Sequence, residues 1–125
     1  DFSGAKVTAQ LNTFHYSVID QIPGVDKQAA MDNFPAMRVA LQAGTIDAYV
    51  SELPEAISAQ AANSDFVMVK LTDGFKTSPE DTQTAVGVRK DSSLTKEINE
   101  ALKTISSEER QQIMQEAIKN QPAAE

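Results

Sequence analysis

Two short polar segments stand where strands of the sequence end. Ser51 and Glu52 follow the apolar run Ile46–Val50, which reads as a buried strand, and residues 10–14 follow an alternating segment that reads as another. A carboxylate such as that of Glu52 is costly to bury unless a partner neutralises it. Its place at the mouth of a strand therefore indicates a binding role toward a cation.

The other segment has the opposite polarity. Asn12 and Thr13 are helix-capping residue types, and the helix that they begin leaves its first backbone N–H groups without partners inside the helix. These groups and the helix dipole favour an anion. If the two strands are neighbours, they can hold a cationic and an anionic group of one ligand close together. A zwitterionic amino acid is the simplest ligand of that kind.

The remaining elements determine whether the strands can be neighbours. The pattern predicts strands over Lys6–Leu11, Ile46–Val50, Asp65–Leu71 and 84–90, helices over 12–22, 32–44 and Pro54–Ala62, and a turn-rich loop over 72–81. Asp32 or Asn33 caps the second helix and Gly44 ends it. Strands separated by helical crossovers are usually parallel, with helices on both faces of the sheet. The sequence therefore predicts an α/β fold with a three-layer, doubly wound, mainly parallel sheet.

After the last predicted strand the pattern becomes helical. Leu94, Ile98 and Leu102 recur at helical spacing, and Ser106 with Glu109 forms an S-x-x-E capping box for a final helix. The sheet is therefore expected to be followed by C-terminal helices.

The composition limits the function. The 125 residues carry a net charge of −7, from 18 acidic and 11 basic residues without a basic cluster, which argues against nucleic acid and anionic membranes as partners. The chain has no cysteine and a single histidine, His15, so cysteine chemistry, a His-rich metal site and a His relay are excluded. We expect no metal and no cofactor. No apolar stretch approaches the roughly 20 residues of a membrane span.

Three segments together resemble the solute-binding proteins of polar amino-acid ABC importers, which have two lobes and the type II periplasmic-binding-protein fold. The segments are DFSGAKVTAQLNTF, ALQAGTIDAYVSELPEA and AVGVRKDSSLTKEINEAL. In that family the second lobe begins with a D-L-x-G-K-x-V-like segment. It later carries a helix ending A-G-x-x-D-A before a strand that ends in an acidic residue. This last feature is the more specific one, and the resemblance spans essentially the whole chain.

The resemblance implies that the chain is a second lobe with its C-terminal helices. Its parts are an α/β core (1–83), a returning hinge strand (84–91), helices that pack on a first lobe (92–119) and a tail (120–125). The first lobe, which supplies the arginine that binds the ligand carboxylate, is not in the sequence. Its loss uncovers the apolar faces of the C-terminal helices, so we expect the chain alone to form homo-oligomers or to swap these helices between copies.

The implied partners are a polar amino acid (glutamine, glutamate or a basic amino acid) and an ABC permease, with no nucleic acid. The implied location is the periplasm, or the extracellular face of a Gram-positive membrane through a lipid anchor or fusion to the permease. Because binding needs contacts from both lobes, the isolated chain is expected to bind weakly or not measurably.

The resemblance also assigns roles to residues. Glu52 falls where the family usually has the aspartate that binds the ligand ammonium, and it is one methylene longer. Thr13 matches the Thr or Ser whose hydroxyl and amide bind the ligand carboxylate, with the amide of Phe14 beside it. Asn12 stands where glycine is common, so the turn can differ. The expected ligand-binding residues are Gln10, Asn12, Thr13, Phe14, Ser51 and Glu52.

Each candidate also has a purely structural interpretation. Glu52 can cap the following helix, and Thr13 is an ordinary helix cap. We expect His15 to face solvent, Asp47 to accept a hydrogen bond from nearby backbone and Tyr16 to join the core, whereas Phe14 suits either core or pocket.

Binding without chemistry is the favoured function. A related two-lobed enzyme, such as a cyclohexadienyl dehydratase, is the alternative, but one histidine, no cysteine and a single acid at the strand mouth provide few acid–base groups. A response-regulator-like signalling domain is a third hypothesis. Such a domain needs acidic residues to hold Mg²⁺ at the end of its first strand, but this chain has Gln10, Leu11 and Asn12 there.

Overall fold

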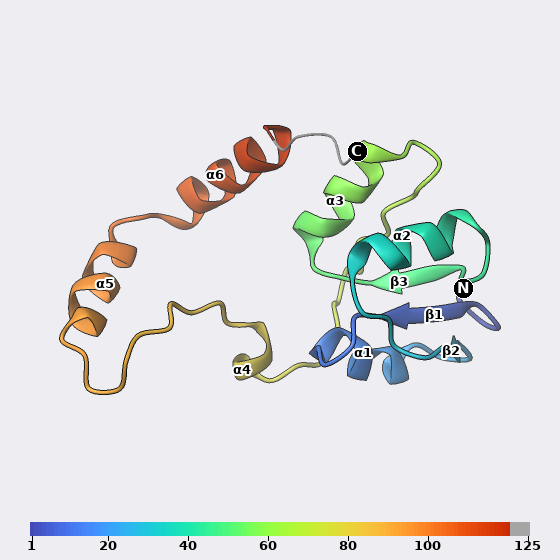
Figure 1. Cartoon of the computed structure of the whole chain (residues 1–125), viewed down its shortest axis with the longest axis horizontal. Coiled ribbons are helices and arrows are strands. Elements are labelled where there is room, and N and C mark those ends of the chain that lie inside the picture. Colours follow the sequence, from blue (N-terminus) through green and yellow to red (C-terminus); the bar gives the residue numbers. More distant parts are fainter. Residues whose placement is uncertain (121–125) are drawn as a thin grey trace. The chain divides into compact units, whose positions relative to one another are not determined.

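The computed structural model describes residues 1–120 and divides the chain into two compact units, Asp1–Thr82 and Gln83–Glu125. The first unit contains a parallel sheet of three strands, shown in Figure 1. β1 (Lys6–Ala9) lies in the centre, between β2 (Asp26–Lys27) and β3 (Ala48–Val50).

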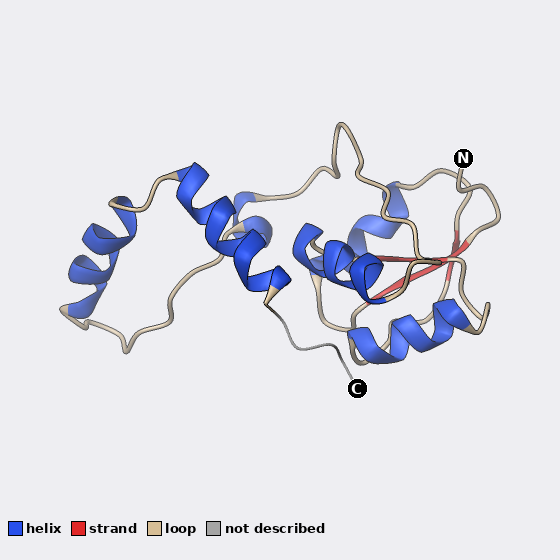
Figure 2. Cartoon of the chain, turned by 90° about the horizontal axis from the view of Figure 1, so that it is seen from above, coloured by secondary structure: helices blue, strands red, loops and turns tan. Residues whose placement is uncertain are grey.

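Helical crossovers join the parallel strands, as this pairing requires. α1 (Phe14–Val18) and the 3₁₀ turn η1 (Ile19–Gln21) lead from β1 toward β2, and α2 (Phe34–Gln42) leads from β2 to β3. Figure 2, in which the sheet is seen nearly edge-on, shows helices on both sides of it. The α/β class and the parallel sheet predicted from the sequence are confirmed.

The core of the first unit forms around the central strand. Val7 and Ala9 on β1 pack against Ile19, and all three are fully buried. Thr8 alternates with them and is also fully buried, and its hydroxyl donates a hydrogen bond to the carbonyl of Ala29 at 2.7 Å. This bond satisfies the buried hydroxyl, which would otherwise cost stability. Tyr16 packs at the border of this core, as predicted.

The ends of α2 follow from its sequence. Asn33 is the cap, and its side-chain oxygen accepts a hydrogen bond from the amide of Ala36 at 2.9 Å. Gly44 follows the helix with φ of 70°, a left-handed conformation that glycine adopts without a steric penalty. The predicted helix stop is therefore confirmed.

Helices account for the remaining regular structure of the described residues. These are α3 (Leu53–Ala62) and the short α4 (Pro79–Thr82) in the first unit, and α5 (Leu94–Lys103) and α6 (Ser107–Lys119) in the second. The capping box is present, since the side chain of Ser106 accepts from the amide of Glu109 at 3.1 Å and the side chain of Glu109 accepts from the amide of Ser106 at 3.3 Å. Of the predicted tail, 120–125, all but Asn120 lies outside the described residues.

Two predicted strands are wrong. Residues 65–71 alternate in exposure as a strand does: Phe66 and Met68 are half-buried, whereas Val67 and Val69 are exposed. Their backbone nevertheless makes no strand pairing. Residues 84–90 are also without strand structure. In both segments β-branched composition indicated a strand, but a strand also needs a neighbour for its backbone groups. β2 was missed because its two residues are too short for a pattern.

Among the described residues no helix combines the length and the apolar character needed to cross a bilayer.

Candidate functional site

The two polar segments lie at the same edge of the sheet. β1 and β3 are parallel neighbours, with Ala9 opposite Val50, so both chains leave the sheet side by side. The segment that begins with Gln10 and the pair Ser51–Glu52 are therefore adjacent. The proximity on which the sequence-based hypothesis depends is present.

The loop after β1 contains a left-handed turn at Asn12. Gln10 makes an isolated parallel bridge with Met31, and its side-chain amide donates to the carbonyl of Asp32 at 3.2 Å. Asn12 has φ of 61°, the left-handed conformation in which glycine is the preferred residue and asparagine is tolerated. Asn12 thus supports a turn of the kind that glycine would make.

Thr13 begins α1, but its hydroxyl is already used. This hydroxyl donates to the carbonyl of Gln10 at 2.7 Å, so its single proton is committed within the loop. A ligand carboxylate only accepts hydrogen bonds, so in this conformation the hydroxyl has no proton left to donate to it. The backbone amides of Thr13, Phe14 and His15 donate no hydrogen bond within the described part of the chain, which leaves them for an external acceptor.

Glu52 is the N-cap residue of α3, as its structural interpretation predicts, but its side chain accepts no hydrogen bond from the first turn of the helix. The carboxylate is about half exposed, with 51% of the side-chain surface accessible. Beside it, the hydroxyl of Ser51 donates to the backbone carbonyl of Glu52 at 3.2 Å. The carboxylate is therefore accessible to a ligand cation.

His15 is the contact that connects the two segments. Its Nε2 atom lies 3.5 Å from Oε2 of Glu52, and only 14% of its side chain is exposed. The imidazole also lies against the ring of Phe14, with 4.1 Å between ring centroids. The prediction that His15 faces solvent is wrong, because the first turn of α1 packs toward the end of β3.

Burial determines the protonation of this histidine. Desolvation lowers the pKa of His15 below its ordinary value of 6.5, and the negative charge of Glu52 opposes this effect in part. The neutral imidazole is therefore the dominant form at neutral pH, and the Glu52 carboxylate is then not neutralised by it.

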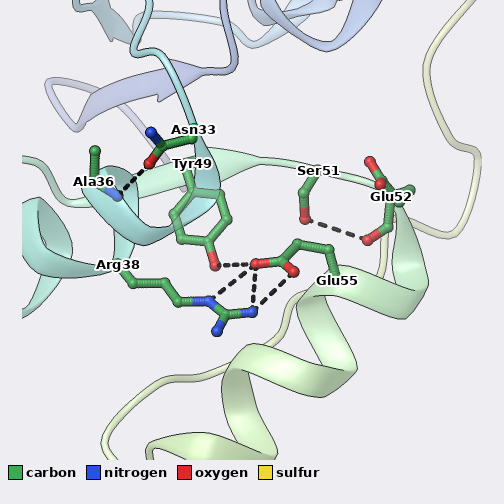
Figure 3. A network of polar contacts seen from close by, with 7 residues as sticks. All are labelled: Asn33, Ala36, Arg38, Tyr49, Ser51, Glu52 and Glu55. Carbon is green, nitrogen blue, oxygen red and sulfur yellow. Dashed lines mark hydrogen bonds and ion pairs between the residues drawn. The ribbon is translucent and has the colours of Figure 1, made fainter. Parts of the chain in front are cut away.

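A second polar group, absent from the sequence-based hypothesis, holds the start of α3. Arg38 of α2 donates to Glu55 through Nε at 3.0 Å and through Nη2 at 2.8 Å to each carboxylate oxygen, and the hydroxyl of Tyr49 donates at 3.4 Å (Figure 3). The side chains of Arg38 and Glu55 are only 23% and 12% exposed. Because Arg38 and Glu55 are 17 positions apart, the sequence pattern gave no indication of this contact.

The two carboxylates at the start of α3, Glu52 and Glu55, differ in their electrostatic surroundings. Burial and the charge of Glu55 raise the pKa of Tyr49, and the hydrogen bonds and charge of Glu55 raise the pKa of Arg38 against the effect of burial. Figure 3 shows the carboxylate of Glu52 pointing away from the Arg38–Glu55 pair. Glu55 is therefore neutralised within the fold, whereas Glu52 remains open to a ligand.

Asp47 has the structural role predicted for it, since its Oδ2 accepts a hydrogen bond from the amide of Lys6 at 2.8 Å. Phe14 is half-buried, and its ring contacts His15.

A cavity of the first unit lies elsewhere. It has a volume of about 710 Å³ and is lined by β3, α3 and the segment around residues 65–75. Ser51 is the candidate residue that borders it, and neither Glu52 nor the loop after β1 takes part. Its lining also includes Val7 of β1, so the cavity extends from β3 to the central strand.

No protein-family model, curated protein or solved structure matches the chain.

Proposed function

We propose that the chain is the amino-acid-binding second lobe of a solute-binding protein that delivers a polar amino acid to an ABC importer. One observation carries the proposal. At neighbouring strand ends, unpaired backbone amides from Thr13 to His15 lie near the exposed carboxylate of Glu52. An α-amino acid carries an anionic and a cationic group on adjacent carbons and so matches this pair of poles.

The energetics favour Glu52 as the principal contact. A hydrogen bond between a carboxylate and an ammonium group contributes about 1.5 to 3 kcal/mol, roughly twice the value for neutral groups. Glu52 makes no ion pair that a ligand must break at neutral pH, because burial keeps His15 mostly neutral there. The amides add weaker bonds to the ligand carboxylate. The half-site alone is therefore expected to bind weakly, at best in the millimolar range.

The remaining affinity comes from a first lobe in the proposed protein. Closure of two lobes on one ligand adds contacts that exist only in the closed form, and these favour closure. The proposal places the whole protein at the extracellular face of the cell membrane or in the periplasm, where an ABC permease receives the ligand.

The test is a calorimetric titration of L-glutamine, L-glutamate and L-arginine into the chain joined to its first lobe, and into the Glu52→Gln variant of the same protein. We expect at least one amino acid to bind and the variant to lose about tenfold to a hundredfold in affinity. Asp20→Asn is a matched control, because Asp20 is an exposed acid that pairs with Lys27 away from this edge. Undiminished affinity in the Glu52 variant would remove the assignment.

The contact between His15 and Glu52 also favours a second candidate, an enzyme of the cyclohexadienyl dehydratase type. A neutral imidazole 3.5 Å from a carboxylate can accept a proton from a substrate. Turnover of prephenate or arogenate by the two-lobed protein, abolished in His15→Gln, would favour this function over transport.

The second unit supports the expectation of self-association. Apolar side chains are exposed on its helices, including Leu94 (51%), Ile113 (56%) and Met114 (47%). Sedimentation velocity of the chain should therefore show concentration-dependent association, and Ile113→Lys should reduce it. A monomer at all accessible concentrations would contradict this part of the proposal.

A further inference from the structure

The position of His15 has a consequence for any cation that binds Glu52. The imidazole lies on α1, the carboxylate lies at the start of α3, and their 3.5 Å separation joins the two strand ends. The imidazole is largely buried and the carboxylate is half exposed, so His15 contacts Glu52 from the protein side and a ligand reaches it from solvent. A protonated His15 and a ligand cation would therefore pair with the same carboxylate, that of Glu52.

The surroundings leave this pair isolated. Near α1, Lys27 pairs with Asp20 at 2.9 Å and lies over the ring of Tyr16 at 4.2 Å. On α2 and α3, Arg38 is bound to Glu55. Within the described residues, Glu52 is therefore the charged group that acts on the imidazole of His15.

We propose that protonated His15 is an internal competitor of the ligand ammonium for Glu52, so that the site releases its amino acid in acid. This inference rests on the proposed function, since it assigns a regulatory role to the same site. Above the pKa of His15 the imidazole is neutral and the carboxylate attracts the ligand. Below that pKa the imidazolium neutralises the carboxylate, and the ligand ammonium loses its main partner.

Linkage fixes the sign and size of the effect. A ligand that takes Glu52 from the imidazolium must lower the pKa of His15, and protonation of His15 must weaken binding by the same factor. The fold-loss of affinity at low pH therefore equals ten raised to the pKa decrease that ligand saturation causes. The only proton transfer in this proposal is the exchange of the His15 proton with solvent.

The experiment follows the imidazole signal by NMR between about pH 5 and pH 8, a range in which histidine titrates. The chain contains one histidine, so the signal needs no assignment by mutation. The titration is run on the chain, on Glu52→Gln and on Asp20→Asn, each with and without L-glutamine, L-glutamate or L-arginine at about 50 mM, which saturates a millimolar site. The amide signal of Thr13 reports ligand binding independently.

We expect Glu52→Gln to lower the pKa of His15 and Asp20→Asn to leave it unchanged. We also expect a bound amino acid to lower the pKa in the native chain but not in Glu52→Gln. Amino-acid affinity should rise with pH in the native chain, whereas His15→Gln should bind with an affinity independent of pH over this range.

Three results would overturn the inference. An unchanged pKa in Glu52→Gln would show that the pair does not interact. A shift of the Thr13 amide without a change in the pKa of His15 would show binding without competition and would leave the proposed function intact. No response of that amide to any of the three amino acids at about 50 mM would contradict the millimolar half-site on which the inference depends, whereas the proposed function is tested separately by the calorimetric titration of the protein with both lobes.

Discussion

The pair formed by Arg38 and Glu55 should contribute more to stability than its charge alone suggests. It joins α2 to α3, and its three contacts of 2.8 to 3.0 Å have the length of charge-assisted bonds. Glu55→Gln leaves the guanidinium, with 23% of its side chain exposed, without a counter-charge. Removing one partner of a fully buried pair costs about 3 to 5 kcal/mol, and partial solvation reduces this to about 2 kcal/mol here.

Urea unfolding measures this cost. The two tyrosines, Tyr16 and Tyr49, both lie in the first unit, and the chain has no tryptophan, so tyrosine fluorescence reports on the unit that contains the pair. Far-UV circular dichroism gives a second signal that does not depend on the contact of Tyr49 with Glu55. Asp20→Asn is the control, because its carboxylate is 69% exposed and its pair with Lys27 should contribute at most about 1 kcal/mol.

A double-mutant cycle isolates the interaction from other effects of the substitutions. Arg38→Gln, Glu55→Gln and the double variant should give a coupling energy of about 1.5 to 3 kcal/mol. A coupling energy close to zero, or a loss in Glu55→Gln no larger than that in Asp20→Asn, would refute the reasoning that this pair holds α3 in place.

Three further predictions concern β1, its following loop and His15. Thr8→Val should destabilise the first unit by about 1 to 2 kcal/mol in urea unfolding, because the carbonyl of Ala29 loses its buried partner, whereas the same change at the exposed Thr45 should cost less than about 0.5 kcal/mol. Asn12→Gly should preserve stability and Asn12→Ala should lower it by about 1 kcal/mol, since φ is 61°; equal stability of the two variants would contradict the left-handed turn. Because burial lowers the pKa of His15, the unfolded chain binds this proton more tightly. The stabilising contribution is complete above pH 6.5 and is lost as the pH falls through the folded-state pKa, so thermal unfolding of His15→Gln should depend less on pH in that window.

The sequence predicted the parts of the fold that depend on local chemistry. Asn33 and Gly44 marked the ends of α2, and Ser106 with Glu109 marked the start of α6, because caps are determined within a few residues. Residues 65–71 and 84–90 failed because strand formation depends on a partner that the local sequence does not specify.

The candidate site shows the same division. Parallel order along the chain was sufficient to place Thr13 and Glu52 at one edge of the sheet. The packing of His15 against Glu52 depends on how the first turn of α1 rests on the sheet, and the pairing of Arg38 with Glu55 depends on the angle between α2 and α3. These contacts come from tertiary packing, which leaves no periodic signal in the sequence.

The most direct test of the proposed amino-acid site is a heteronuclear NMR titration of this chain, joined to its first lobe, with the three amino acids, compared with the Glu52→Gln variant of the same protein. The proposal predicts that the amides of Thr13, Phe14 and His15 shift together at millimolar amino acid, and that the shifts largely disappear in the variant. Absence of these shifts at about 50 mM, or equal shifts in both proteins, would contradict it.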